Sequence, residues 1–346
     1  MPFAEIIGQD RAVGALRAAL RRGALHHAYL FGGPEGVGKG RVARLLAQAA
    51  NCDRGLADDP CGTCVPCRKI ARGVHPDVLT LAEERVMAKA GTWEPRGGKT
   101  PSKDIVVDQV RDVVDRRLAL RRFEGRRRFV IVDPADRMNP QAQNALLKTL
   151  EEPPPATTLV LVASNPDVLL PTIRSRCLRV SFGPIPAEQV ETRLVAAGRT
   201  PAAARFLASL SGGSLGRALS LPADEEELAE ERAAIVDAAA LDAGDAGRWL
   251  AWAARHGRDR EHAASTLQLI GLWLRDVLAV QAGAPAAALA LADVSDATRR
   301  VAAAVGPGDV ARRRAEIQRT TEALKQNASP VLALEAMLVG WFHGRA

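Results

Sequence analysis

The first 180 residues alternate short apolar runs with helix-like stretches, which is the pattern of a parallel β-sheet with crossover helices. Between the runs, apolar residues recur at helical spacing over 40–51, 105–118 and 140–150. Residues 89–103 are rich in glycine, lysine and proline and predict a mobile loop. The apolar runs themselves predict five strands, at residues 27–31, 77–81, 128–133, 158–164 and 177–182.

The strand pattern ends at Phe182. Gly183-Pro184-Ile185-Pro186 interrupts it, and the alanine-rich remainder has helical periodicity with short polar turns. Residues 187–220 predict a small helical domain, and residues 225–346 a second one. Near Trp273 and Trp341, apolar residues recur every three to four positions, which indicates helix packing rather than a ligand site.

Composition and charge narrow the class of protein. The chain has 346 residues, of which 47% are hydrophobic and 25% charged, enough to fill several packed cores. It has no uncharged run of the roughly 18 residues that a membrane span needs, and its first residues do not resemble a signal peptide. We therefore expect a cytoplasmic protein without a membrane partner.

The net charge of +7 is unevenly distributed. Residues 1–180 hold 29 basic and 20 acidic residues, and residues 181–346 hold 18 and 20. Forty of the 47 basic residues are arginines. The excess in the first half indicates either a biased composition or a basic face for nucleic acid or nucleotide phosphates.

A phosphate-binding loop follows the first predicted strand. Gly33-Pro34-Glu35-Gly36-Val37-Gly38-Lys39-Gly40 matches glycine, four residues, then Gly-Lys, and it opens a helix. Gly33, Gly36 and Gly38 let the backbone turn around phosphates, and Lys39 can reach the terminal ones. The next position should be a serine or threonine that holds Mg²⁺, but it is Gly40.

The third strand has a second departure from a hydrolytic site. Asp133 at its end could lie near a metal ion, as in a Walker B strand. In hydrolysing AAA+ proteins the acid that activates water comes next, and here that position is Pro134. We expect this site to bind ATP weakly or not at all, and not to hydrolyse it.

Four of the five cysteines lie within sixteen residues. Cys52, Cys61, Cys64 and Cys67 have intervals of eight, two and two residues. Clustered thiols in a cytosolic chain favour a metal over disulfides, and four thiolates suit a structural, tetrahedral Zn²⁺. An iron–sulfur cluster and unligated buried thiols are the alternatives.

Two longer motifs identify a family. Asn144-Ala145-Leu146-Leu147-Lys148-Thr149-Leu150-Glu151-Glu152-Pro153-Pro154 and Ser175-Arg176-Cys177 resemble bacterial DNA polymerase III clamp-loader subunits, which are AAA+ proteins. Ile7-Gly8-Gln9-Asp10, the strand at 27–31, the cysteine insert and the segment 327–335 agree with this resemblance. It therefore covers nearly the whole chain.

The resemblance implies a fold of three domains. We expect an α/β P-loop AAA+ domain at 1–180, with a five-stranded parallel sheet and a zinc-binding insert at 52–67. An all-α lid should follow at 181–225 and an all-α collar at 226–346. The collar should supply contacts between subunits through the faces of Trp273 and Trp341.

The resemblance also implies the function and partners. Gly40 and Pro134 favour a non-hydrolysing delta-prime-type subunit over the ATP-hydrolysing gamma/tau type, which remains the alternative. Its partners would be the gamma/tau and delta subunits, the sliding clamp and primed DNA. Arg176 would be an arginine finger that reaches the ATP of a neighbouring subunit.

Other positions match the family less closely. Ser164 or Asn165 lies in the sensor 1 region, where its role would be structural. Arg217 is displaced by one residue from the sensor 2 arginine. The arginines between 116 and 128 suit either a solvated turn or a DNA contact. A stand-alone zinc-bearing DNA-binding protein is a third hypothesis.

Overall fold

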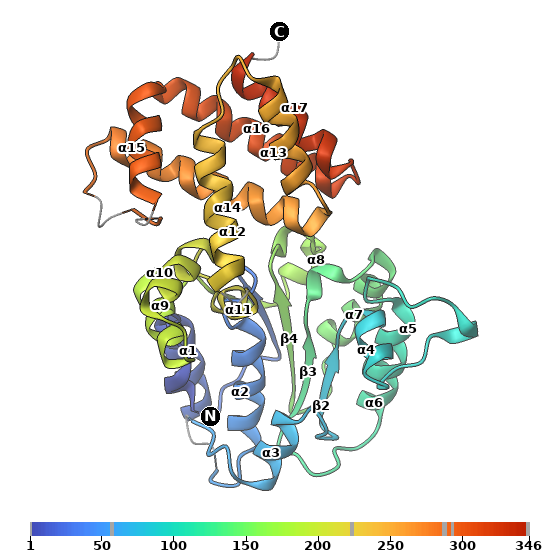
Figure 1. Cartoon of the computed structure of the whole chain (residues 1–346). Helices are drawn as coiled ribbons and strands as arrows, with labels where there is room; N and C mark the ends of the chain where they lie inside the picture. The colour runs from blue at the N-terminus through green and yellow to red at the C-terminus, as the bar shows by residue number, and fades with distance from the viewer. Residues whose placement is uncertain (1, 56–58, 222–224, 286–288, 292–293, 344–346) are drawn as a thin grey trace. The chain divides into compact units, whose positions relative to one another are not determined.

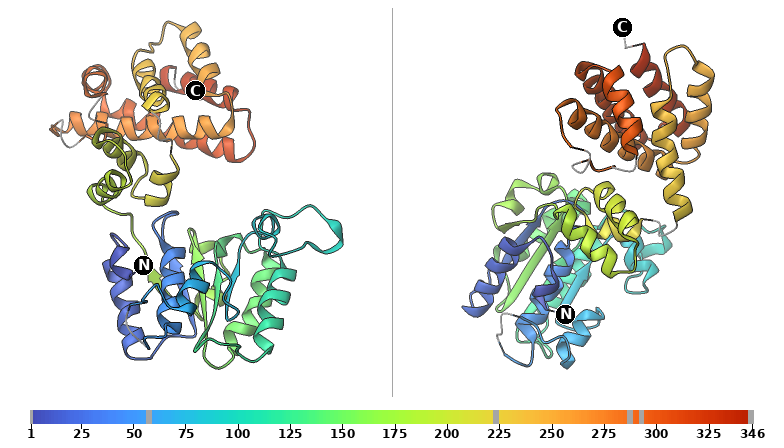
Figure 2. Two further views of the ribbon diagram at one scale, coloured as in Figure 1. Left: turned by 60° about the horizontal axis from the view of Figure 1, so that its bottom comes forward. Right: turned by 60° about the vertical axis from the view of Figure 1, so that its left-hand side comes forward.

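The computed structural model of the chain describes residues 2–55, 59–221, 225–285, 289–291 and 294–343. The chain divides into two compact units. The first comprises Met1–Gln189 and Gly213–Arg217, and the second comprises Val190–Gly212 and Ala218–Ala346. Figures 1 and 2 show the helices and strands of both. Residues 56–58 of the expected zinc insert and 222–224 of the expected lid lie outside the described residues.

The first unit is built on a five-stranded sheet with the order β2-β3-β4-β1-β5, in which every paired strand is parallel to its neighbour. This confirms the predicted α/β fold, and each observed strand falls within two residues of a predicted one. The strands are β1 (Ala28–Gly32), β2 (Val78–Leu81), β3 (Arg128–Val132), β4 (Thr157–Ala163) and β5 (Leu178–Ser181).

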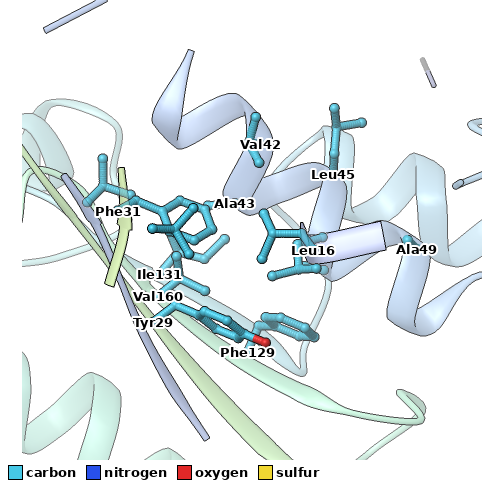
Figure 3. Close-up of a cluster of buried hydrophobic side chains, with 14 of the residues drawn as sticks. Leu16, Tyr29, Phe31, Val42, Ala43, Leu45, Ala49, Phe129, Ile131 and Val160 are labelled. Atoms are coloured by element: carbon cyan, nitrogen blue, oxygen red, sulfur yellow. The ribbon is translucent and has the colours of Figure 1, made fainter. Parts of the chain in front are cut away.

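Both faces of this sheet are covered, so β1, β3 and β4 are buried at every position and are mainly apolar. Successive side chains of a strand point to opposite faces. Tyr29 and Phe31 accordingly join a cluster with the helices α1 and α2, whereas Leu30 joins the cluster on the other side. Figure 3 shows the first cluster, in which the rings of Tyr29, Phe31 and Phe129 pack near Leu16 and Val42.

The helices of the first unit follow the predicted order, with one difference. The stretch predicted as a single helix over 105–118 consists of two short α-helices joined by a π-helical segment, Val110–Asp115. The predicted loop at 89–103 contains a 3₁₀ turn, Arg96–Gly98. The α-helices are α1 (Asp10–Arg21), α2 (Lys39–Asn51), α3 (Val65–Ala71), α4 (Glu84–Lys89), α5 (Val107–Gln109), α6 (Arg116–Ala119), α7 (Pro140–Glu151) and α8 (Pro171–Arg174).

The chain beyond β5 is helical, as predicted. In the second unit α14 is central, because it contacts α12, α13, α15, α16 and α17. The helices beyond β5 are α9 (Ala187–Ala196), α10 (Pro201–Leu210), α11 (Leu215–Ser220), α12 (Glu225–Ala239), α13 (Ala246–His256), α14 (Arg260–Gln281), α15 (Ser295–Ala304), α16 (Pro307–Lys325) and α17 (Pro330–Phe342).

The length and apolar composition of α14 would also allow it to cross a membrane, the only such helix among the described residues, but half of its apolar window is buried in the protein. Leu267, Ile270 and Leu274 are fully buried on it. These features are those of a core helix.

The two tryptophans expected to face other subunits do not do so. Trp273 and Trp341 are 0% and 1% exposed, so the helices of their own unit cover both rings. The periodicity correctly predicted helix packing, and the two rings themselves are not available for a contact with another subunit. Exposed large apolar side chains of the second unit lie elsewhere, at Val195, Leu219, Val236, Leu250, Leu332 and Val339.

Candidate nucleotide and metal sites

The phosphate loop connects β1 to α2 at the carboxyl ends of the parallel strands. Because β1 pairs with β4, and β4 with β3, the residues that follow these strands lie side by side. They line a hollow of about 480 Å³ that includes Gly36, Gly38, Lys39 and Asp133. The structure thus brings together the loop and the acidic strand end that the sequence predicted.

The glycine at position 36 is required by a close neighbour. Its backbone is left-handed (φ +73°), and a Cβ atom there would lie 2.1 Å from the Ser214 hydroxyl oxygen. Gly216 N–H also donates to the Gly36 carbonyl at 2.9 Å. The segment Gly213–Arg217 therefore packs directly on the loop within the first unit. Gly216 lines the hollow, and Arg217 is not among the residues that line it.

Lys39 is folded onto its own loop. Its ammonium group donates to the carbonyl oxygens of Gly33 and Pro34, both at 2.6 Å, and lies 3.4 Å from the Ser164 hydroxyl. Only 5% of the residue is exposed. Burial lowers the pKa of Lys39, although Asp133, Asp136 and Glu35 oppose the shift. To reach a phosphate, this side chain must give up two short hydrogen bonds.

Gly40 is in contact with Asp133. A Cβ atom at Gly40 would lie 2.1 Å from Oδ2 of Asp133 and 3.2 Å from its Cγ. The carboxylate therefore occupies the space that a serine or threonine at this position would need. Burial raises the pKa of Asp133, against the attraction of Arg44 and Lys39.

The position after Asp133 carries no side-chain base, because it is Pro134. Asp136 is a further acid in the hollow, which sequence analysis missed. Its Oδ2 accepts from the backbone N–H groups of Ser164 and Asn165, at 3.1 and 2.9 Å. Ser164 and Asn165 thus help to anchor the end of β4. No local sequence signal marks Asp136, since its role depends on the pairing of β3 with β4.

Arg176 lies in a second hollow, of about 490 Å³, whose lining shares no residue with that of the first. Its guanidinium donates to the Thr172 carbonyl at 2.9 Å and pairs with Glu151 at 2.8 Å. The side chains of Arg176 and Glu151 are 36% and 50% exposed. An exposed arginine held by one carbonyl and one half-exposed acid can change partners at little cost in free energy.

The four cysteines converge. The sulfur atoms of Cys52, Cys61, Cys64 and Cys67 all lie within 4.8 Å of one another, and those of Cys52 and Cys64 are 4.0 Å apart. A tetrahedral zinc site with Zn–S distances near 2.3 Å has sulfur–sulfur edges of about 3.8 Å. The donor set therefore fits a Cys₄ metal ion after shifts of less than about 1 Å.

The surroundings of these thiols favour metal binding. The Thr63 hydroxyl and the N–H of Cys64 donate to the Cys61 sulfur at 3.6 and 3.3 Å, and they lower the pKa of Cys61 to about 5. Burial raises the pKa of Cys67. An unligated Cys67 would thus stay protonated, whereas a metal ion would take up its thiolate. The fifth cysteine, Cys177, lies beside Arg176, and burial raises its pKa to about 12.

Comparisons with known proteins identify the relatives of the first unit. A family model described as "DNA polymerase III, delta subunit" matches residues 8–186. The chain is 40% identical over 191 residues to DNA polymerase III subunit delta' of Pseudomonas aeruginosa, covering 54% of this chain and 53% of that protein. It is 35% identical over 226 residues to subunit tau of Escherichia coli, covering 63% of this chain and 32% of tau.

The matched regions thus span about half or less of these relatives' lengths. A solved structure of a DNA polymerase III gamma-subunit-related protein from Thermotoga maritima aligns over 96% of this chain and 99% of its own, with 16% identity and a TM-score of 0.46.

Proposed function

Because the chain belongs to the bacterial DNA polymerase III clamp-loader family of AAA+ subunits, we propose that it is the delta-prime-type member of such a complex. In this role it takes part in ATP-dependent loading of the sliding clamp onto primed DNA in the cytoplasm. Its partners are the gamma/tau and delta subunits. The expected arrangement is a P-loop domain (1–180), a lid (181–225) and a collar (226–346).

One contact carries this proposal. The Asp133 carboxylate fills the space beside Gly40 where a hydrolytic site places its metal-binding hydroxyl. Pro134 offers no base, and Lys39 is bound to its own loop. These features support a site that does not turn over ATP, so the subunit contributes by its contacts rather than by its own chemistry.

The proposed contribution is Arg176 as an arginine finger in trans. Such a guanidinium stabilises the charge that develops on the transferred phosphoryl group, which is worth about 10³–10⁵ in rate at the site it completes. Its half-exposed pairing with Glu151 leaves it able to exchange one anion for another. The Cys₄ cluster would hold a structural Zn²⁺, which leaves no open position for catalysis.

The test is DNA-stimulated ATP hydrolysis by the reconstituted complex. Arg176→Ala should leave assembly intact and abolish the turnover of the one site that it completes. Arg174→Ala is a matched control, because Arg174 is two residues away and pairs with Asp167 at 2.6 Å. Unchanged hydrolysis in the Arg176 variant would refute the finger role.

The gamma/tau-type motor is the second candidate, and the match to tau favours it. A motor would hydrolyse ATP with its own Lys39. Turnover by the isolated chain that is abolished in Lys39→Ala would establish the motor and exclude the delta-prime role. Absence of turnover in the isolated chain, with loss of complex activity in Arg176→Ala, would support our proposal.

A further inference from the structure

The loop between α6 and β3 exposes an aromatic ring. Phe123 is 82% exposed, more than any other large hydrophobic side chain in the described part of the chain, and Leu120 nearby is 67% exposed. The loop lies where β3 begins, whereas the phosphate loop follows the end of β1. Because the strands are parallel, the loop lies at the amino ends of the strands and the phosphate loop lies at their carboxyl ends.

A buried carboxylate fixes the backbone of this loop. Asp77 is 2% exposed and accepts hydrogen bonds from three successive N–H groups, those of Phe123 (3.0 Å), Glu124 (2.8 Å) and Gly125 (2.7 Å). The N–H of Arg127 donates to Asn51 at 3.0 Å. A loop held in this way presents the Phe123 ring without a large cost in conformational entropy when a ligand binds.

Four arginines near Phe123 in sequence carry positive charge that no described carboxylate pairs with. Arg117, Arg121, Arg122 and Arg126 are exposed, and none forms an ion pair with a carboxylate of the described residues. Arg122 and Arg126 bond instead to the backbone carbonyls of Arg126 and Asp53, which carry no charge.

The one acid of the loop is already neutralised by a neighbouring helix. Glu124 pairs with Lys69 of α3 at 2.7 Å and lies 3.7 Å from the imidazole of His75. This ion pair also joins the loop to α3, which exposes Arg68 and Arg72. Two exposed arginines thus lie in and directly after the helix that is joined to the loop through Lys69.

The same run of arginines contains two that are structural. Arg127 donates to Thr158 at 2.7 Å, and Arg128 donates to the carbonyls of Leu118 and Leu120 at 2.9 and 2.8 Å. Only the exposed arginines are free for a ligand. The fold, and not composition alone, therefore decides which arginines of this run can contact a ligand.

We propose that this surface, Leu120–Arg126 together with α3, binds single-stranded nucleic acid. A base would stack on Phe123 while the flanking arginines contact the backbone phosphates. Arginines and aromatic rings also occur in protein–protein interfaces, but four exposed arginines without a paired carboxylate among the described residues match the charge of a polyanion. A duplex hides the faces of its bases, so an aromatic ring in this setting selects an unpaired strand. This inference goes beyond the proposed function, because it concerns the isolated chain and involves neither Arg176 nor ATP.

The experiment measures binding of a fluorescein-labelled oligothymidylate of about 20 nucleotides, longer than a typical single-strand binding site, by anisotropy. Phe123→Ala should weaken binding about 5- to 150-fold, since stacking is worth about 1–3 kcal/mol per base. Phe123→Trp should retain the affinity. The substituted side chain is solvent-exposed, so both variants should melt with the parent.

Salt dependence tests the arginines separately. The double variant Arg121→Ala/Arg122→Ala should bind more weakly and lower the slope of log K against log salt by about 1.4, or about 0.7 per lost phosphate contact. Arg300→Ala/Arg314→Ala is the matched control, because these two arginines are exposed on the helical unit and outside this surface. That pair should leave affinity and slope unchanged.

Equal affinity of the parent and Phe123→Ala would overturn the proposal, as would an unchanged salt slope in the double variant. If the variants bound the oligonucleotide normally but failed to associate with other clamp-loader components, the surface would be a protein contact and the proposal wrong. None of these outcomes depends on ATP hydrolysis, so the delta-prime assignment stands or fails independently.

Discussion

Restoring the missing hydroxyl at position 40 should harm the protein rather than revive an ATPase. In Gly40→Ser the new Cβ atom would lie 2.1 Å from Oδ2 of Asp133, a separation that packed atoms do not tolerate. The carboxylate is half-buried and attracted by Arg44 and Lys39, so it must turn away from these partners into the hollow to admit the new atom. Such overpacking costs about 1–3 kcal/mol.

The expected loss can be measured by thermal melting. For a unit of this size, 1 kcal/mol shifts the melting temperature by about 2–4 °C, so Gly40→Ser should lower it by about 2–12 °C. Gly40→Ala separates sterics from chemistry, because it adds the same Cβ without a hydroxyl and should lose as much. In Gly40→Ser/Asp133→Ala the clash is removed, and the added serine should cost less than it does beside Asp133.

Adding Mg²⁺ and ATP completes this experiment. A ligand that binds only the folded state raises the melting temperature, so a restored site would reveal itself directly. We expect no such rise in Gly40→Ser. If this variant melted with the parent and was stabilised by Mg²⁺ and ATP, the argument that Asp133 fills the hydroxyl's place would be refuted.

Three further predictions concern metal and pH. The purified protein should release near-stoichiometric Zn²⁺ when its thiols are titrated, and Cys64→Ser should abolish that release. Asp77→Asn should lower the free energy of unfolding by about 1–3 kcal/mol, because an NH₂ group replaces one of the two oxygens that accept from the three N–H groups, and the charge that attracts Arg128 is lost. Burial alone would raise the pKa of Asp77, but those N–H groups and Arg128 outweigh it, so the pKa lies below its ordinary value. The advantage of the parent over Asp77→Asn in urea denaturation should therefore be present at pH 7 and shrink as the pH falls below about 4. Burial lowers the pKa of His256 to about 4, against 6.5 for an exposed imidazole. The unfolded chain thus gains a proton first, and the helical unit should lose stability as the pH falls from 6.5 towards 4, a loss that His256→Phe should remove in the same assay.

The sheet and the phosphate loop could be predicted because their signals are local. A strand buried on both faces needs a mainly apolar run, and β1, β3 and β4 each supply one. A turn around phosphates needs glycines at fixed spacing before a lysine. The cysteine cluster was equally accessible, since intervals of two residues bring thiols together in a short turn.

The roles of the arginines could not be predicted, because they depend on residues far away in sequence. Arg121 and Arg128 belong to one run, yet the first is exposed and the second is 4% exposed beside Asp77. The burial of the two tryptophan rings could not be predicted for the same reason. Helical spacing shows that Trp273 belongs to an apolar stripe, but only the packing of α14 shows that its own chain covers that stripe.

Burial also separates arginines that hold the fold from those that can act on a ligand. Arg128 donates to two backbone carbonyls in a nearly closed environment, and removing it would take the donor from those two acceptors and the paired cation from Asp77. The pair between Arg176 and Glu151 is half-exposed, and such pairs contribute only about 0–1 kcal/mol. A phosphate from another subunit can therefore displace Glu151 at small cost, whereas no ligand could recruit Arg128 without disrupting the start of β3. This difference in exchange cost is the physical reason to place the proposed trans contact at Arg176.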